Sequence, residues 1–145
     1  MQTARDIDTL LAIYGESHRK HSNELMHMVC VPVIVFSLLG ILWWLHPLVA
    51  LAVCAGALCY YVKLSPRFAI GMLIMTLLML GVLNAMARQA VLPLSLALFV
   101  LAWIGQFIGH KIEGKKPSFL DDVRFLLIGP LFVLGFLYRR FKLQY

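Results

Sequence analysis

The sequence predicts an all-α, multi-span membrane helix bundle, with four crossings and a C-terminal segment that is re-entrant or interfacial. Hydrophobic residues make up 61% of the 145 residues and charged residues only 14%, whereas soluble domains have about 45–50% and about 25%. The apolar residues also lie in long runs whose edges carry the charges. A soluble monomer of this size could not bury so much apolar surface, so we expect one integral membrane domain over residues 1–145.

The first 27 residues are polar and are expected to form a cytoplasmic or interfacial segment. An amphipathic helix is predicted to end near Lys20, and a second helix is predicted to start at Asn23, a strong N-cap residue. His18 and His27 are nine residues apart, which on one straight helix is about 900° and places them on opposite faces. A turn between them would allow the two imidazoles to converge.

Four apolar runs are predicted to cross the membrane. They cover about residues 28–45, 48–62, 68–86 and 91–109. Each run matches or approaches the length of about 20 helical residues that a hydrocarbon core requires. A fifth run, residues 125–138, is shorter and carries Pro130 near its middle, so we expect it to be re-entrant or interfacial rather than a full crossing.

The basic residues predict the side of the membrane that each loop faces. With four crossings and a cytoplasmic N-terminus, all of the 13 Lys and Arg residues except Arg88 lie on the cytoplasmic side. A fifth crossing would move Arg139, Arg140 and Lys142 outside, against the positive-inside rule. We therefore expect both termini in the cytoplasm, in a membrane such as the bacterial inner membrane.

The net charge of +6 does not predict a nucleic-acid partner. The basic residues lie at the edges of the apolar runs, where membrane topology and anionic headgroups account for them. The lipid bilayer is therefore the expected partner. The three cysteines lie inside apolar runs and form no CxxC pair, so neither a disulfide framework nor a thiolate metal site is predicted.

Three histidines are expected to meet at the cytoplasmic face. The topology places His18 and His27, near the start of the first span, beside His110 at the end of the fourth, while His46 falls on the far side. Glu113 follows His110 by three residues and shares its helix face, a spacing used in carboxylate-histidine iron sites. Imidazole nitrogens with open coordination positions suit iron, zinc or copper, so this cluster is a candidate metal site.

Two spaced motifs then connect the chain with a family. They read Tyr14-x3-His18-x4-Asn23-x3-His27-x4-Pro32 and Gln106-Phe-Ile-Gly-His110-x2-Glu113-x3-Pro117, followed by Gly129-Pro130-Leu-Phe-Val. With the apolar spans between and around them, these motifs resemble the 2-hydroxy fatty acid dioxygenase family over almost the whole chain.

The resemblance implies a membrane enzyme that requires Fe(II) and converts a 2-hydroxy fatty acid and O2 into a fatty acid one carbon shorter, the alpha-oxidation step. By position, His18, His27 and His110 would be iron ligands, and Asn23 and Glu113 would lie in or next to the site.

Two further assignments concern residues around these ligands. His21, one turn from His18, does not match the motif and is expected to be a fourth ligand, the partner of a ligand or a solvated histidine at the membrane interface. O2 and a bidentate substrate leave room for about three protein ligands on a six-coordinate ion. Glu113 is therefore expected to accept a hydrogen bond from a ligand imidazole rather than to bind the metal.

Three other classes of protein remain open at this point. A bis-histidine haem protein could use His27 and His110, and a Soret band would identify it. A desaturase-like di-iron hydroxylase normally needs about eight histidines, whereas this chain has five. A non-enzymatic membrane scaffold or small transporter would have Asn84 and Arg88 as the polar feature of a pathway, and its function would survive loss of bound iron.

Overall fold

A computed structural model describes residues 2–145 and confirms the all-α class. Over this range the chain forms six α helices and one short 3-10 helix, η1, and contains no strand. The elements are α1 (Gln2–Glu16), α2 (His21–Leu45), α3 (Pro47–Leu64), α4 (Pro66–Ala85), α5 (Arg88–Glu113), η1 (Ser118–Leu120) and α6 (Phe125–Arg140).

Helices α2 to α5 are each long and apolar enough to cross a membrane, in agreement with the four predicted crossings. Two of them extend well beyond the predicted spans: α2 begins at His21 and α5 continues to Glu113. The additional turns contain polar and charged residues. An apolar run in the sequence ends at such residues, but a helix can continue through them at a membrane interface. As a result, His27 and His110 both lie on regular helix.

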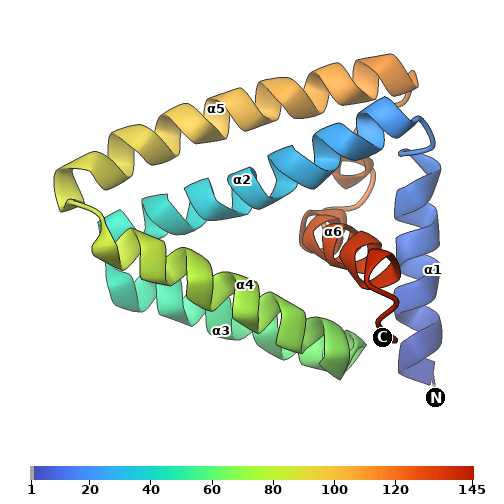
Figure 1. Ribbon diagram of the computed structural model, residues 1–145, viewed down its shortest axis with the longest axis horizontal. Coiled ribbons are helices and arrows are strands. Elements are labelled where there is room, and N and C mark those ends of the chain that lie inside the picture. The colour runs from blue at the N-terminus through green and yellow to red at the C-terminus, as the bar shows by residue number, and fades with distance from the viewer. Residues whose placement is uncertain (1) are drawn as a thin grey trace.

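The four long helices form two antiparallel pairs, α2 with α5 and α3 with α4, which are arranged as the two arms of a V (Figure 1). Single extended residues, His46 and Ser65, connect α2 to α3 and α3 to α4. Each is followed by a proline at the first helical position, which disfavours the helical conformation in the preceding residue and suits the start of the next helix. At the open end of the V, α6 lies between the arms and α1 runs across them.

Glycines allow close packing within the α2·α5 arm. A Cβ atom at Gly109 would lie 2.5 Å from Asn23 Oδ1, and one at Gly105 would lie 2.6 Å from Cys30 Sγ. These two glycines therefore allow α2 and α5 to approach each other closely.

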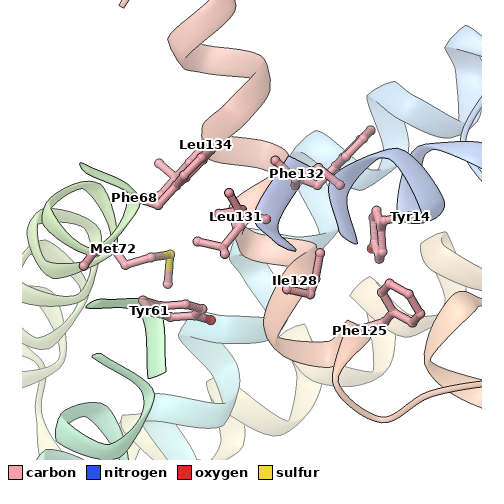
Figure 2. Packing of buried hydrophobic residues seen from close by; sticks show 12 residues of the cluster. Tyr14, Tyr61, Phe68, Met72, Phe125, Ile128, Leu131, Phe132 and Leu134 are labelled. Carbon is pink, nitrogen blue, oxygen red and sulfur yellow. The ribbon is translucent and has the colours of Figure 1, made fainter. Parts of the chain in front are cut away.

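Helix α6 is buried over most of its surface. Its 16 residues include an unbroken buried stretch from Ile128 to Gly135, and it is not among the helices long enough to cross a membrane. Figure 2 shows Ile128 and Leu131 between Tyr14 on one side and Phe68 on the other. Burial on all faces fits the re-entrant alternative better than the interfacial one, and the position of α6 in the bilayer stays a prediction.

Candidate metal centre and adjoining cavity

Three buried histidines from different segments converge at the open end of the V. His18 follows α1, His27 lies on α2 and His110 lies on α5, and their side chains are 4%, 2% and 5% exposed. One ring nitrogen from each lies within 4.8 Å of the other two. The structure thus brings together the three side chains that the predicted topology places at one membrane face.

The turn between α1 and α2 makes this convergence possible, but it differs from the predicted one. Helix α2 begins at His21, before Asn23, so the predicted N-cap role of Asn23 is wrong. Asn23 is instead fully buried in the first turn of α2. Its Nδ2 donates hydrogen bonds to the carbonyl oxygen of Ser17 at 2.9 Å and to Glu113 Oε2 at 3.4 Å. Asn23 therefore ties the turn to the two helices that carry His27 and His110.

Hydrogen bonds fix the protonated nitrogen in two of the three rings. His18 Nδ1 donates to the carbonyl oxygen of Tyr14 at 2.6 Å, and His27 Nδ1 donates to that of Asn23 at 3.2 Å, because a carbonyl oxygen can only accept. Burial lowers the pKa of His18 to about 4, so its ring is neutral at pH 7. The lone pair of the His18 ring is therefore on Nε2.

The Nε2 atoms of His18 and His27 face each other at 2.8 Å. With both Nδ1 atoms acting as donors, the two Nε2 lone pairs would repel each other unless a proton or a metal ion intervened. Two nitrogen atoms that each bind one metal ion through a bond of about 2.0–2.1 Å lie no more than about 4 Å apart, so this separation is compatible with a shared ion. His110 adds a third ring to the group, and its buried Nδ1 has no hydrogen-bond partner within residues 2–145. The donor set fits iron, zinc or copper.

Tyr14 supports the ring of His18 in two ways. In addition to accepting the hydrogen bond, its own ring stacks on His18 with a centroid distance of 4.4 Å and an interplanar angle of 13°. Tyr14 is 6% exposed and lies 5.1 Å from Phe132 of α6, measured between ring centroids. The stacking on His18 depends on the turn that follows α1, so no local pattern in the sequence predicts it.

Glu113 contacts the turn rather than a histidine. Its two carboxylate oxygens accept hydrogen bonds from the backbone N–H groups of Arg19 at 3.1 Å and Lys20 at 2.8 Å, and a longer one from Asn23. Among the described residues no hydrogen bond joins Glu113 to an imidazole, and the carboxylate is outside the group of close ligand atoms. It fastens a turn 94 residues earlier in the chain to the end of α5, and so helps to place His18.

His21 is not brought to the cluster. Its side chain is 77% exposed, and its Nδ1 lies 3.7 Å from Glu24 Oε2. The prediction placed His21 next to His18 because residues one turn apart share a face, but this holds only on a continuous helix. The turn between α1 and α2 interrupts the helix there, so His21 is removed from the proposed ligand set.

A cavity of about 290 Å³ adjoins the histidine cluster. His27 is the first lining residue on α2 and His110 the last on α5, so both histidines lie at the same end of the cavity. Most of the remaining wall is apolar and includes Val31, Ile34, Val35, Leu38, Phe99, Phe119, Phe125, Leu126 and Pro130. This arrangement suits a molecule with a polar head and an alkyl chain. No local pattern in the sequence predicts the cavity, because its wall comes from helices that are distant in the chain.

The fold and the site together define a helical membrane protein with a buried cluster of three histidines beside an apolar cavity. Residues 4–141 match the family described as 2-hydroxy-palmitic acid dioxygenase Mpo1-like, and the chain belongs to this family. A curated relative, 2-hydroxy-palmitic acid dioxygenase MPO1 of Saccharomyces cerevisiae, is 28% identical over 142 residues, which cover 89% of this chain and 78% of the relative. No solved structure matches the chain. The family resemblance of the two motifs is thereby confirmed.

The structure gives little support to the haem and transporter alternatives. The ring centroid of His18 lies 3.9 Å from that of His27 and 5.0 Å from that of His110, so this third ring occupies space that a macrocycle between the other two would need. Asn84 is exposed, and Arg88 donates a hydrogen bond to the carbonyl oxygen of Trp44 at the narrow end of the V. Neither Asn84 nor Arg88 lines the cavity.

Proposed function

We propose that the protein is an Fe(II)-dependent dioxygenase that converts 2-hydroxy fatty acids and O2 into fatty acids one carbon shorter. The observation that carries this proposal is the position of three buried histidines, with ring nitrogens within 4.8 Å of one another, at one end of an apolar cavity. The yeast relative is named for 2-hydroxy-palmitic acid, a molecule with a polar head and a long alkyl chain. The two parts of the site match the two parts of such a substrate.

The proposed iron ligands are His18, His27 and His110. With only three protein ligands, the ion would have room to bind the substrate and O2. When bound, Fe(II) would supply the one-electron chemistry that O2 needs to react with an organic acid. The chain supplies neutral imidazoles held in fixed orientations, and an apolar wall that receives the alkyl chain and excludes water.

Asn23 and Glu113 are proposed to act as positioning residues. Both contact the turn that carries His18, and the amide of Asn23 also bonds to the carboxylate of Glu113. They would keep His18 Nε2 directed at the cluster while the site exchanges substrate and product. Their contribution to the reaction is therefore exerted through the geometry of the histidines.

The proposed location is a membrane, with the site at its cytoplasmic face; in a bacterial cell this is the inner membrane. The proposal rests on the basic residues flanking the spans and on the four apolar helices. The alkyl chain of the substrate would then come from the bilayer. A reporter fused after Tyr145 should read as cytoplasmic, and an external reading would contradict this orientation.

The central experiment combines metal analysis with turnover. Protein purified anaerobically in detergent should contain about one iron per chain, and adding O2 and 2-hydroxypalmitic acid should yield pentadecanoic acid. Palmitic acid serves as the control substrate and should give no shortened product. Protein that binds no iron, or that shortens palmitic acid equally well, would contradict the proposal.

A further inference from the structure

The cavity beside the histidine cluster is lined by polar atoms that lack protein partners. In the part of the chain that the structure describes, these buried atoms are Trp103 Nε1, Gln106 Oε1, His110 Nδ1 and Ser118 Oγ, and all four residues line the cavity. Buried polar atoms are nearly always hydrogen-bonded, because an unpaired one retains the full cost of its desolvation. A molecule with a polar head group that binds in this cavity is therefore expected to supply partners for those of the four atoms that lie beside its head.

Gln106 is the neutral polar residue on α5 nearest to the cluster. It lies four residues before His110, on the same helix face and about 6 Å away along the axis. Its side chain is only 4% exposed. Trp103 and Phe99 continue the same stripe of α5 along the wall. A substrate with its head at His110 and its chain along α5 would therefore present its first carbons to Gln106.

We propose that Gln106 recognises the 2-hydroxyl group of the substrate, an inference that rests on the proposed function. Its Oε1 is an acceptor and needs a donor. The hydroxyl of a 2-hydroxy acid is a donor, whereas an ionised carboxylate only accepts. An unsubstituted fatty acid would leave Oε1 buried and unpaired, and a site built to bond a hydroxyl discriminates strongly against an analogue that lacks it. Gln106 is thus the residue that selects 2-hydroxy acids.

Ser118 supplies a complementary contact in this arrangement. Its hydroxyl is buried, 8% of the residue is exposed, and Oγ has no partner within residues 2–145. A serine hydroxyl can donate to a carboxylate oxygen, which is present on substrate and product alike. Ser118 would therefore bind both acids, while Gln106 distinguishes them. Because the product has no 2-hydroxyl group, it leaves Gln106 unpaired, which favours exchange of product for new substrate.

The test compares the binding of two acids to wild-type protein and to Gln106→Met, which keeps the side-chain length and removes the amide. Affinities for 2-hydroxypalmitic acid and palmitic acid are measured by calorimetry on anaerobic, iron-loaded protein in detergent. The ratio of the two affinities should fall about tenfold in Gln106→Met, as expected for loss of one buried hydrogen bond, while iron content is unchanged. Gln106→Asn, which keeps the amide but withdraws it by one methylene group, should lower the ratio too and serves if the Met variant does not fold.

The matched control is Thr76→Val. Thr76 is a buried polar residue of α4, 8% exposed, that lines a second cavity between α2, α3, α4 and α6 and does not line the cavity beside the histidines, so the ratio should keep its wild-type value in this variant. Wild-type ratios in both Gln106 variants would overturn the role of Gln106 and leave the proposed function intact. Wild-type protein that neither prefers nor shortens 2-hydroxypalmitic acid would instead overturn the proposed function itself.

Discussion

The two arms of the V have similar hydropathy but different interiors. The α2·α5 arm buries six polar side chains: Asn23, His27, Ser37, Ser95, Gln106 and His110. In the α3·α4 arm, the buried polar residue other than tyrosine is Thr76. The glycines differ as well, because a Cβ at Gly109 or Gly105 would meet the facing helix, whereas one at Gly56 or Gly81 would meet nothing within 4 Å.

This difference indicates that the two helix pairs have different roles, although both are long and apolar. Polar side chains inside a membrane are costly and are found mainly where function requires them. The α3·α4 arm carries few, and many of its large apolar side chains are exposed, as expected for surface in contact with lipid. The α2·α5 arm brings its polar residues together by close helix packing. Matched substitutions in the two arms, or at the two ends of the V, can therefore test whether the functional site lies in the α2·α5 arm at the open end.

The largest effect is expected from the histidines. Replacing His18, His27 or His110 by Ala should abolish iron retention and turnover together, because each removes one of only three donors. His46→Ala, at the narrow end, and His21→Ala, at the exposed start of α2, should retain both. Iron-to-protein ratios and product formation provide the measurement. Equal losses at His46 would mean that the cluster is not the metal centre.

A smaller loss is expected for Glu113→Gln. The amide keeps one acceptor oxygen but directs an NH2 group at a backbone N–H, so the turn that carries His18 loosens. Removing a group that orients metal ligands typically costs about 10–100-fold in metal affinity or activity, and both should fall here. Competition with a chelator measures the affinity. Glu24→Gln, beside the exposed His21, is the control, and indistinguishable results for the two variants would contradict a positioning role for Glu113.

The packing difference between the arms is tested by one substitution at two positions. Gly109→Ala should lower the free energy of unfolding by about 1–3 kcal/mol, because its Cβ would lie 2.5 Å from Asn23 Oδ1 and would push α2 and α5 apart. Gly81→Ala faces open space and should change it by less than about 1 kcal/mol. Thermal unfolding in detergent compares them. A Gly109→Ala protein as stable as wild type would argue against tight packing in the α2·α5 arm.

The smallest effect concerns pH and the metal-free protein. Burial lowers the pKa of His18 from 6.5 to about 4, so the unfolded chain takes up a proton at a higher pH than the folded protein does. Protonation of His18 therefore lowers the free energy of unfolding. This loss is complete below about pH 4 and is absent above about pH 6.5. Unfolding followed between pH 7.5 and 4.5 should show falling stability as the pH falls. The dependence of the free energy of unfolding on pH should be weaker in His18→Gln and unchanged in His21→Gln. An unchanged pH dependence in His18→Gln would contradict burial of a neutral ring.

The sequence by itself predicted the features that depend on composition along the chain. Apolar runs give the four long helices, because each must match a hydrocarbon core with its own residues. Basic flanks predict the orientation of these helices, and this orientation already brings His18, His27 and His110 to one end. Short-range patterns are sufficient to predict these features because a helix that crosses a membrane can point in only one of two directions across it.

Only the tertiary structure decided how the site is held and what surrounds it. The predicted role of Asn23 as an N-cap was wrong, and His21 lies exposed and away from the cluster, because both positions depend on where the chain turns. That turn is fastened by Glu113, 94 residues away in sequence from Arg19. The cavity and the unpaired amide oxygen of Gln106 likewise arise between helices that are distant in the chain. Hydrogen bonds and cavities of this kind depend on which side chains meet after folding, and no local pattern of hydropathy or charge specifies that.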